Sequence, residues 1–318
     1  MNKALESLAL PGTPAGLYDP VRYALALGGK RLRPRLLLLT NGLCKGDPEQ
    51  ALPAAVAVEL LHNFTLVHDD IMDRAETRRG KPSVYAKWND ASAILSGDVL
   101  FVLAIRQLNH FGTLEGDGHP DSSRLISLFL DTIQTVCDGQ AMDMEFEERK
   151  VVAIHEYMEM IRAKTAALIR CSMEMGAFVA GVDDRTREQC GEIGMHAGLA
   201  FQIQDDLLDA IGASEHFGKK VGGDILEGKK TYLSIRAMER ADDTDRLLLE
   251  EILGNSNAGE SDILRVIRIY HDLGVIDDAI TRINSHYNQA MEKLSLFEET
   301  SYRKEIKALF EKLKVREN

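Results

Sequence analysis

Two short stretches in which aspartates recur four residues apart constrain the fold more than any other feature. They cover residues 69–73 (DDIMD) and 205–209 (DDLLD), and each ends an apolar run. On a helix, positions i and i+4 lie one turn apart, a rise of about 6 Å, so both carboxylates point the same way. Like charges at this spacing repel by roughly 0.2–0.5 kcal/mol, which favours a bound cation. The two stretches therefore predict one cavity that holds divalent metal between two helices.

A solvated helix end is the alternative explanation for either stretch alone. Adjacent aspartates begin at residues 69, 183, 205, 242 and 277, but only those at 69 and 205 are followed by the further aspartate at i+4. Both of these stretches follow apolar residues with helical spacing. The repetition favours a metal site over two idle helix ends.

The composition narrows the class of protein. The 318 residues are 45% hydrophobic and 28% charged, with a net charge of −12 that argues against binding nucleic acid or anionic membranes. Four cysteines without metal-ligand spacing indicate reduced thiols. No signal peptide and no apolar run of 18 residues are found. We expect a cytoplasmic protein with no stable membrane insertion.

Nearly the whole chain is predicted to be helical, because proline is scarce and no strand-like alternation appears. Expected helices cover residues 19–27, 34–43, about 47 to the first aspartate stretch, 89–111, 121–149, 154–180 and 185–212, with four shorter helices reaching Lys314. Asp19 and Asn89 are the expected N-caps of two of these. Without repeats or linkers, the sequence predicts one all-α domain over residues 1–318.

Basic residues gather in loops and at helix ends around the acids. Residues 28–34 (GGKRLRP) place three cations on a glycine turn before a helix, which is a geometry that binds phosphate. Further cations occur at 78–79, 164, 219–220 and 229–230. Each of these cations alone is most simply a solvated charge. Together with the aspartates they suit a phosphate substrate, because Mg²⁺ prefers one or two carboxylates together with substrate phosphates. The combination predicts a diphosphate substrate, and no nucleotide-binding P-loop motif is present.

These motifs resemble those of the trans-isoprenyl diphosphate synthases, also called polyprenyl synthetases. The resemblance covers roughly residues 20–235 and rests on motifs in matching order. They are GGKRLRP at 28–34, His62 before the first aspartate stretch, Arg78-Arg79-Gly80, Gly139-Gln140 with Asp143, Lys164-Thr165, FQIQDD at 201–206, Gly218-Lys219, and Asp224 through Lys229.

The resemblance implies an all-α isoprenoid synthase fold, a large helical bundle around a deep central cavity, and a homodimer. It implies head-to-tail condensation of isopentenyl diphosphate with an allylic diphosphate (dimethylallyl, geranyl or farnesyl), with three Mg²⁺ per active site. The ions and the surrounding cations would stabilise the leaving diphosphate, so no protein nucleophile is required.

The resemblance also implies a role for each matching residue. The metal ligands would be Asp69, Asp73 and Asp205. Supporting catalytic residues would be Asp70, Asp206, Asp209 and Lys164. The allylic diphosphate would be held by Arg78, Lys164, Thr165, Gln202, Lys219 and Lys229. Isopentenyl diphosphate would be bound by Lys30, Arg33, His62 and Arg79.

In this family, the length of the product depends on the size of the side chains that come shortly before the first aspartate motif. Phe64 and Thr65 resemble the chain-length floor of geranylgeranyl diphosphate synthases, and a farnesyl diphosphate synthase is the alternative. Ideal helix phase does not itself place Phe64 in the cavity, and an ordinary core position is the competing interpretation. Two rivals share the fold. A terpene cyclase should lack the isopentenyl diphosphate residues, and a noncatalytic subunit could lose its carboxylates, yet both sets are present.

Overall fold

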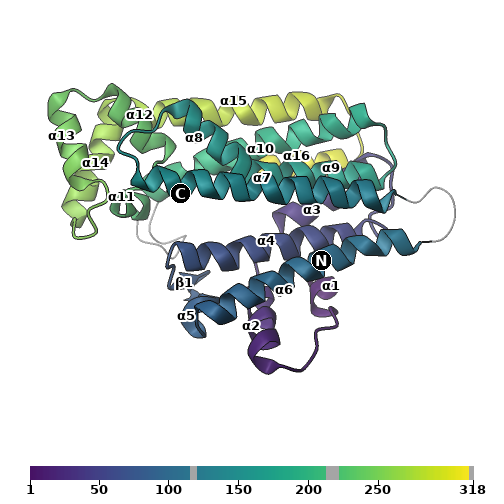
Figure 1. The fold of residues 1–318 in the computed structure, drawn as a ribbon. Coiled ribbons are helices and arrows are strands. Elements are labelled where there is room, and N and C mark those ends of the chain that lie inside the picture. Colours follow the sequence, from purple (N-terminus) through teal and green to yellow (C-terminus); the bar gives the residue numbers. More distant parts are fainter. Residues whose placement is uncertain (115–119, 213–221, 315–318) are drawn as a thin grey trace. The chain divides into compact units, whose positions relative to one another are not determined.

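A computed structural model describes residues 1–114, 120–212 and 222–314, and helices dominate them (Figure 1). The elements in chain order are α1 (Asn2–Glu6), α2 (Ala15–Ala26), α3 (Leu32–Leu43), α4 (Leu52–Met72), β1 (Thr77–Arg78), β2 (Lys81–Pro82), α5 (Val84–Lys87), α6 (Asp90–Asn109), η1 (His110–Thr113), α7 (Ser122–Glu148), α8 (Ile154–Ile161), η2 (Arg162–Ala166), α9 (Ala167–Val179), α10 (Asp184–Ile211), α11 (Gly223–Glu227), α12 (Tyr232–Arg240), α13 (Asp243–Ile252), α14 (Glu260–Asp272), α15 (Val275–Ser295) and α16 (Ser301–Lys314). The all-α prediction is confirmed.

The chain divides into two compact units. The first comprises residues 1–130 and 171–190, and the second comprises 131–170 and 191–318. Each unit has its own buried apolar side chains, and each is described by itself below. The expectation of one domain over residues 1–318 stays a prediction.

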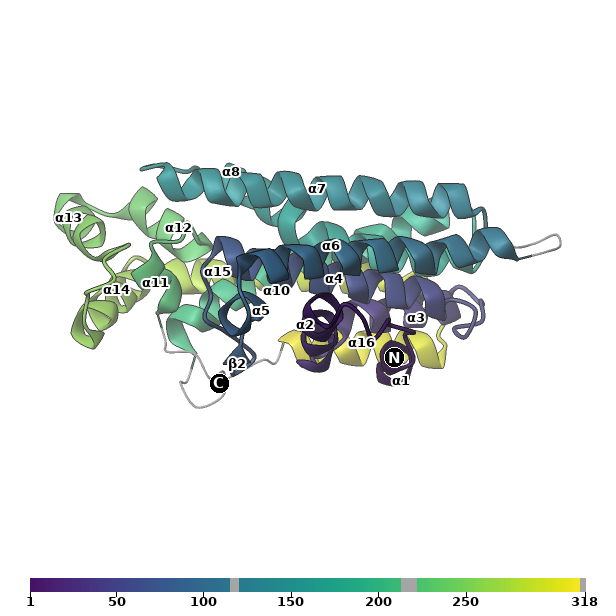
Figure 2. The same cartoon turned by 60° about the horizontal axis from the view of Figure 1, so that its bottom comes forward.

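In the first unit, α4 lies along α6, and α3 packs against α4 (Figures 1 and 2). Leu60 and Leu61 of α4 and Leu100 of α6 are at most 1% exposed. This burial fixes the rotation of α4 about its axis, because side chains three or four residues apart share a face. The orientation of the first aspartate motif at the end of α4 follows from that packing.

In the second unit, α12 packs against α14 and α15, and α15 packs against α16. Tyr157, Tyr270 and Tyr287 are each 1% exposed. Aromatic side chains of this size contribute much of the burial that stabilises a core, and a buried hydroxyl needs a hydrogen-bond partner. The Tyr157 hydroxyl finds that partner in the second aspartate motif, as described below.

Helix starts were predicted with mixed success. Asn89 caps α6 as expected, with its Oδ1 accepting the Ser92 N–H at 2.8 Å. The N-cap predicted at Asp19 is wrong, because α2 begins at Ala15 after Pro14 and runs through Pro20. Pro14 O already accepts N–H groups of residues 17 and 18, so the first turn forms earlier.

Other predicted boundaries also need correction. α4 begins at Leu52 rather than near residue 47, because residues 48–51 form a turn. The helix expected over 154–180 is interrupted by η2, a π-helical turn. Five helices rather than four follow residue 230, and α15 is long. Apolar periodicity continues through such interruptions, so the sequence pattern does not reveal them.

One small hairpin follows the first aspartate motif. β1 and β2 pair antiparallel, with Arg78 opposite Lys81. The turn residues Arg79 and Gly80 have φ angles of 56° and 73°. Positive φ at both central residues characterises the type I′ turn that suits the twist of a two-residue hairpin. Strands this short carry no alternating pattern, which is why they were not predicted.

Candidate active site

The first aspartate motif occupies the last turn of α4. Asp73 is the C-cap, and its N–H donates to Asp69 O at 2.8 Å, so helical bonding continues through the motif. Asp69 and Asp73 therefore share a face, with Asp73 exposed and Asp69 partly exposed. A helix C-terminus already carries partial negative charge, which adds to the repulsion between the two carboxylates. This helix end is thus suited to a divalent cation.

Asp70 points away from that face and is 2% exposed. Its Oδ1 accepts from Arg78 Nε at 2.9 Å and from the same guanidinium's Nη2. Burial raises the pKa of Asp70, and the hydrogen bond from Arg78 opposes that rise. Arg78, predicted to hold the allylic diphosphate, is therefore an ion-pair partner of Asp70 in this structure, with its side chain 27% exposed.

Arg79 packs onto the glycine turn that precedes α3. Gly28 and Gly29 have φ angles of 81° and 136°, a region that side chains other than glycine rarely adopt. A Cβ on Gly29 would lie 2.7 Å from Arg79 Nη2, and Arg79 Nη1 donates to Gly28 O. The β1–β2 hairpin and the basic turn are therefore joined through Arg79.

His62 joins the same group of residues. Arg33 Nη1 lies 3.2 Å from His62 Nε2. Burial and then the charge of Arg33 hold the pKa of His62 well below its ordinary value. His62 is therefore neutral, and its Nε2 accepts from Arg33. The structure thus brings Arg33, His62 and Arg79 to the turn that carries the exposed Lys30.

Phe64 lies on α4 and faces α6. Its ring centroid is 4.7 Å from that of His68 and 5.8 Å from that of Phe101 on α6. Thr65 donates from Oγ1 to His62 O at 3.0 Å, so its hydroxyl is engaged by its own helix. Phe64 is neither fully buried nor exposed. Its predicted role as a chain-length floor stays a prediction.

The second aspartate motif lies near the end of α10, in the second unit. Asp206 is 7% exposed, and its Oδ2 accepts from Tyr157 Oη at 2.6 Å and from Tyr232 N–H at 3.1 Å. Its Oδ1 accepts from Gln202 Nε2 at 3.0 Å. Burial raises the pKa of Asp206, and these three donors oppose that rise. Both oxygens of Asp206 are thus used by the protein, whereas Asp205 is partly exposed.

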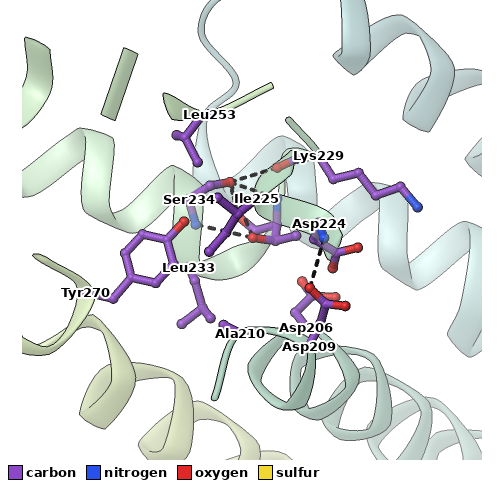
Figure 3. A pocket seen from close by; sticks show the side chains of 11 residues that line it. Asp206, Asp209, Ala210, Asp224, Ile225, Lys229, Leu233, Ser234, Leu253 and Tyr270 are labelled. Carbon is purple, nitrogen blue, oxygen red and sulfur yellow. Dashed lines mark hydrogen bonds between the residues drawn. The ribbon is translucent and has the colours of Figure 1, made fainter. Parts of the chain in front are cut away.

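Asp209 meets the start of α11. Its Oδ2 accepts the Asp224 N–H at 2.9 Å, and Figure 3 shows Asp206 and Asp209 below Asp224. Burial, followed by the charges of Asp209 and Asp206, raises the pKa of Asp224 to about 7. The cavity beside them measures about 10 Å³, room for no more than one water. Sequence reasoning assigned no role to Asp224, although this residue begins the motif Asp224 through Lys229.

Lys164 and Thr165 lie in the π-helical turn η2, which brings them toward α7 and α10. A Cβ on Gly139 of α7 would lie 2.3 Å from Lys164 N, so only glycine allows this approach. Lys164 Nζ pairs with Asp143 at 2.5 Å, and Thr165 Oγ1 donates to Gln202 Oε1 at 2.8 Å. The π turn is typical of functional sites.

A second cavity of about 120 Å³ lies beside this turn. Its polar lining residues come from α7, α8, η2, α10, α11 and the segment that follows α11. They are Asp143, Tyr157, Lys164, Thr165, Gln202, Asp206, Asp224, Lys229, Lys230 and Thr231. Four of the six residues predicted to hold the allylic diphosphate thus line one cavity in the second unit. They are Lys164, Thr165, Gln202 and Lys229.

Lys229 and Lys219 were both predicted to hold the allylic diphosphate, and of the two only Lys229 lies in the described part of the chain. Lys229 lies 3.1 Å from Glu227 as an ion pair. Lys219, together with Gly218 and Lys220, lies outside the described residues. Tyr157 and Asp143 were missed as functional partners. A tyrosine gives no spacing signal, and Asp143 shows only that it follows Gly139 by one helical turn.

The donor chemistry fits Mg²⁺. The candidate ligands are carboxylate oxygens, which hard cations prefer. Over residues 1–114, 120–212 and 222–314, no cluster of three or more His, Cys, Asp or Glu side chains could hold a metal alone. Mg²⁺ retains waters and takes substrate phosphates in place of a complete protein cage, so paired aspartates suit it.

The chain matches a known protein family over most of its length. The family model of polyprenyl synthetases matches residues 14–270. A geranylgeranyl diphosphate synthase from Saccharolobus solfataricus is 43% identical over 247 residues, covering 78% of this chain and 74% of that one.

Two solved structures are also similar. A geranylgeranyl pyrophosphate synthetase from Pyrococcus horikoshii Ot3 aligns with a TM-score of 0.92 and 36% identity, covering 99% of this chain and 95% of that one. A polyprenyl synthase from Caulobacter crescentus CB15, complexed with calcium and isoprenyl diphosphate, aligns with a TM-score of 0.89 and 27% identity, covering 100% and 94%. The chain therefore has the isoprenoid synthase fold and belongs to the polyprenyl synthetase family of prenyltransferases.

Proposed function

We propose that this chain condenses isopentenyl diphosphate head-to-tail with an allylic diphosphate, in a reaction that requires Mg²⁺, and that geranylgeranyl diphosphate is its product. One observation carries the proposal. The first unit combines a carboxylate pair, Asp69 and Asp73, with a separate basic group built around the turn before α3. Two diphosphates bound in different ways, one through metal and one through cations, match these two features. The names of the relatives support the product.

Metal binding is assigned to Asp69, Asp73 and Asp205. The ions would neutralise the allylic diphosphate and thereby make it a better leaving group. The resemblance to the family implies three ions per site. Asp70, Asp206 and Asp209 support the motif helices through contacts with Arg78, Tyr157 and α11.

The remaining residues act on the substrates. Lys164, Thr165, Gln202 and Lys229, with Arg78 and Lys219, hold the allylic diphosphate as its C–O bond breaks. Lys30, Arg33, His62 and Arg79 hold isopentenyl diphosphate so that its double bond attacks the allylic cation. The proton lost from the new chain goes to the departed diphosphate, so no protein nucleophile takes part.

The protein is proposed to act as a soluble, cytoplasmic homodimer. The stretch Asp90–Thr113, which includes α6, is long and apolar enough to cross a membrane, but a dimer interface would cover the same apolar surface. Only 33% of its most apolar 18 residues are buried within the subunit. Ile94, Leu95 and Val102 of α6 are 46%, 54% and 50% exposed, which leaves an apolar face for a second copy. Sedimentation of the wild type and of Leu95→Glu tests this. The proposal expects a dimer that weakens in the variant, and a monomeric wild type would overturn it.

The reaction is tested by diphosphate release. Purified protein with Mg²⁺ and farnesyl diphosphate should release diphosphate only when isopentenyl diphosphate is added, and a chelator should abolish the release. Release without isopentenyl diphosphate would indicate a terpene cyclase. No release under any condition would indicate a noncatalytic helical protein.

A further inference from the structure

Arg31 lies between two residues proposed to bind isopentenyl diphosphate, yet its side chain turns inward. Its side chain is 10% exposed, whereas the neighbouring Lys30 is exposed. The backbone of Arg31 is left-handed, with φ 47° and ψ 40°, immediately before α3. Arg31 Nη2 donates to Leu25 O at 3.0 Å, and its Nη1 donates to Glu59 Oε1. The chain reversal at Arg31 is thus held by its own side chain.

Glu59 is the acceptor for this arginine and is 1% exposed on α4. Asn63 Nδ2 donates to Glu59 Oε1 at 3.1 Å and to Glu59 O at 2.7 Å. Burial of a carboxylate is unfavourable unless charge and hydrogen bonds compensate it. Among the described residues, Glu59 Oε2 is buried without a hydrogen-bond partner, so Oε1 carries the compensation.

This pair lies beside the proposed substrate residues and is largely buried. Glu59 precedes His62 by three residues, almost one turn of α4, and Arg33 bonds to His62 two residues after Arg31. The turn and the first residues of α3 are therefore attached to α4 at two points, Arg31–Glu59 and Arg33–His62. Two attachments fix a short turn in both position and rotation, whereas one leaves it free to pivot.

We propose that Glu59 and Arg31 form a positioning pair that sets the isopentenyl diphosphate subsite. The pair orients the turn so that Lys30 projects outward while Arg33 meets His62. This inference rests on the proposed function. Because the pair acts on the turn before α3, it affects isopentenyl diphosphate and leaves the allylic diphosphate residues Lys164 and Gln202 unchanged.

Steady-state kinetics on Glu59→Gln test the proposal. Glutamine keeps the shape of the side chain but removes the charge that holds Arg31. The KM for isopentenyl diphosphate should rise about tenfold, with the KM for the allylic diphosphate within about twofold of the wild type. Glu174→Gln is the matched control, because Glu174 is a 5% exposed glutamate in the same unit, on α9. It should leave the ratio of the two KM values unchanged.

A second variant keeps the test decisive if Glu59→Gln does not fold. Arg31→Lys retains a cation beside Glu59 but loses the fork that also reaches Leu25 O. It should raise the KM for isopentenyl diphosphate by about threefold without changing the other KM. An unchanged KM ratio in the folded variants would overturn the proposal. A wild type that never consumes isopentenyl diphosphate would instead overturn the proposed function.

Discussion

Arg33 and His62 share a contact of 3.2 Å between Nη1 and Nε2, and this contact makes the imidazole an acceptor. An acceptor at Nε2 requires a neutral ring with its proton on Nδ1. Burial and the charge of Arg33 lower the pKa of His62 well below its ordinary value, in agreement with that tautomer. The substrate-free protein therefore presents a neutral His62 at physiological pH.

His62 should not titrate between pH 6 and 8 in the free enzyme. Its ring C–H resonance, assigned by comparison with His62→Gln, should keep a constant chemical shift across this range. Arg33→Gln should move the pKa of His62 upward, because a neighbouring positive charge is removed. A midpoint for His62 near its ordinary value in the wild type would contradict the hydrogen-bond assignment.

Phe64→Ala should lengthen the product by one or more isoprene units. The substitution removes a ring of α4 that packs against Phe101 of α6, and the space it leaves admits a longer chain. Phe111→Ala is the control, since Phe111 is a 3% exposed ring just after the C-terminal end of α6, away from Phe64. Phe111→Ala should lose about 3–5 kcal/mol of stability, and Phe64→Ala less, because Phe64 is only partly buried. Product sizing by chromatography distinguishes the two variants. Equal product lengths would contradict the assignment of Phe64 as the residue that limits chain length.

Asp205 and Asp206 should respond differently to the same substitution. Asp205→Asn should lower kcat at least about 100-fold, as expected for loss of a metal ligand. Asp206→Asn should lower kcat no more than about tenfold, but it should reduce the free energy of unfolding by about 1–3 kcal/mol, because Asp206 accepts from Tyr157, Tyr232 and Gln202. Kinetics and urea unfolding of both variants measure this, and equal effects on kcat would contradict the assignment.

Stability should fall in mild acid because of His286, a buried histidine paired with His196. His286 Nδ1 lies 3.2 Å from His196 Nδ1, and burial followed by His196 lowers the pKa of His286 to about 4. The unfolded chain has a pKa of about 6.5 and so binds the proton first. Stability is therefore lost as pH falls from about 6.5 toward 4, by roughly 1–3 kcal/mol.

The matched variant for that effect is His286→Gln, which cannot gain a proton. Its urea midpoint should change less than that of the wild type between pH 7 and pH 4.5, although it starts lower. Parallel changes in the two proteins would show that other groups cause the acid sensitivity.

Much of the fold follows from local sequence rules, but several details do not. Asn89 was a correct N-cap because Asn followed by Asp is a strong local signal. The N-cap predicted at Asp19 is wrong because hydrogen bonds to Pro14 O start the helix earlier in the chain. The π turn at Lys164 depends on Gly139, a residue 25 positions away (164 − 139), and no local pattern encodes it.

The site shows the same limit. The sequence identified both aspartate motifs but did not separate Asp205 from Asp206, because the difference is made by Tyr157 and Tyr232 from other helices. Arg31 and Lys30 are adjacent cations, yet only Arg31 turns inward, toward Glu59. Such assignments depend on tertiary contacts between residues that are distant in the chain.

The most direct test of the proposed function is the identity of the product. The purified chain is incubated with Mg²⁺, isopentenyl diphosphate and dimethylallyl diphosphate, and the products are dephosphorylated and identified by mass spectrometry. The account predicts geranylgeraniol as the main final alcohol. Farnesol as the end product would contradict the chain length, and the absence of any longer alcohol with dimethylallyl, geranyl and farnesyl diphosphate alike would contradict prenyl transfer itself.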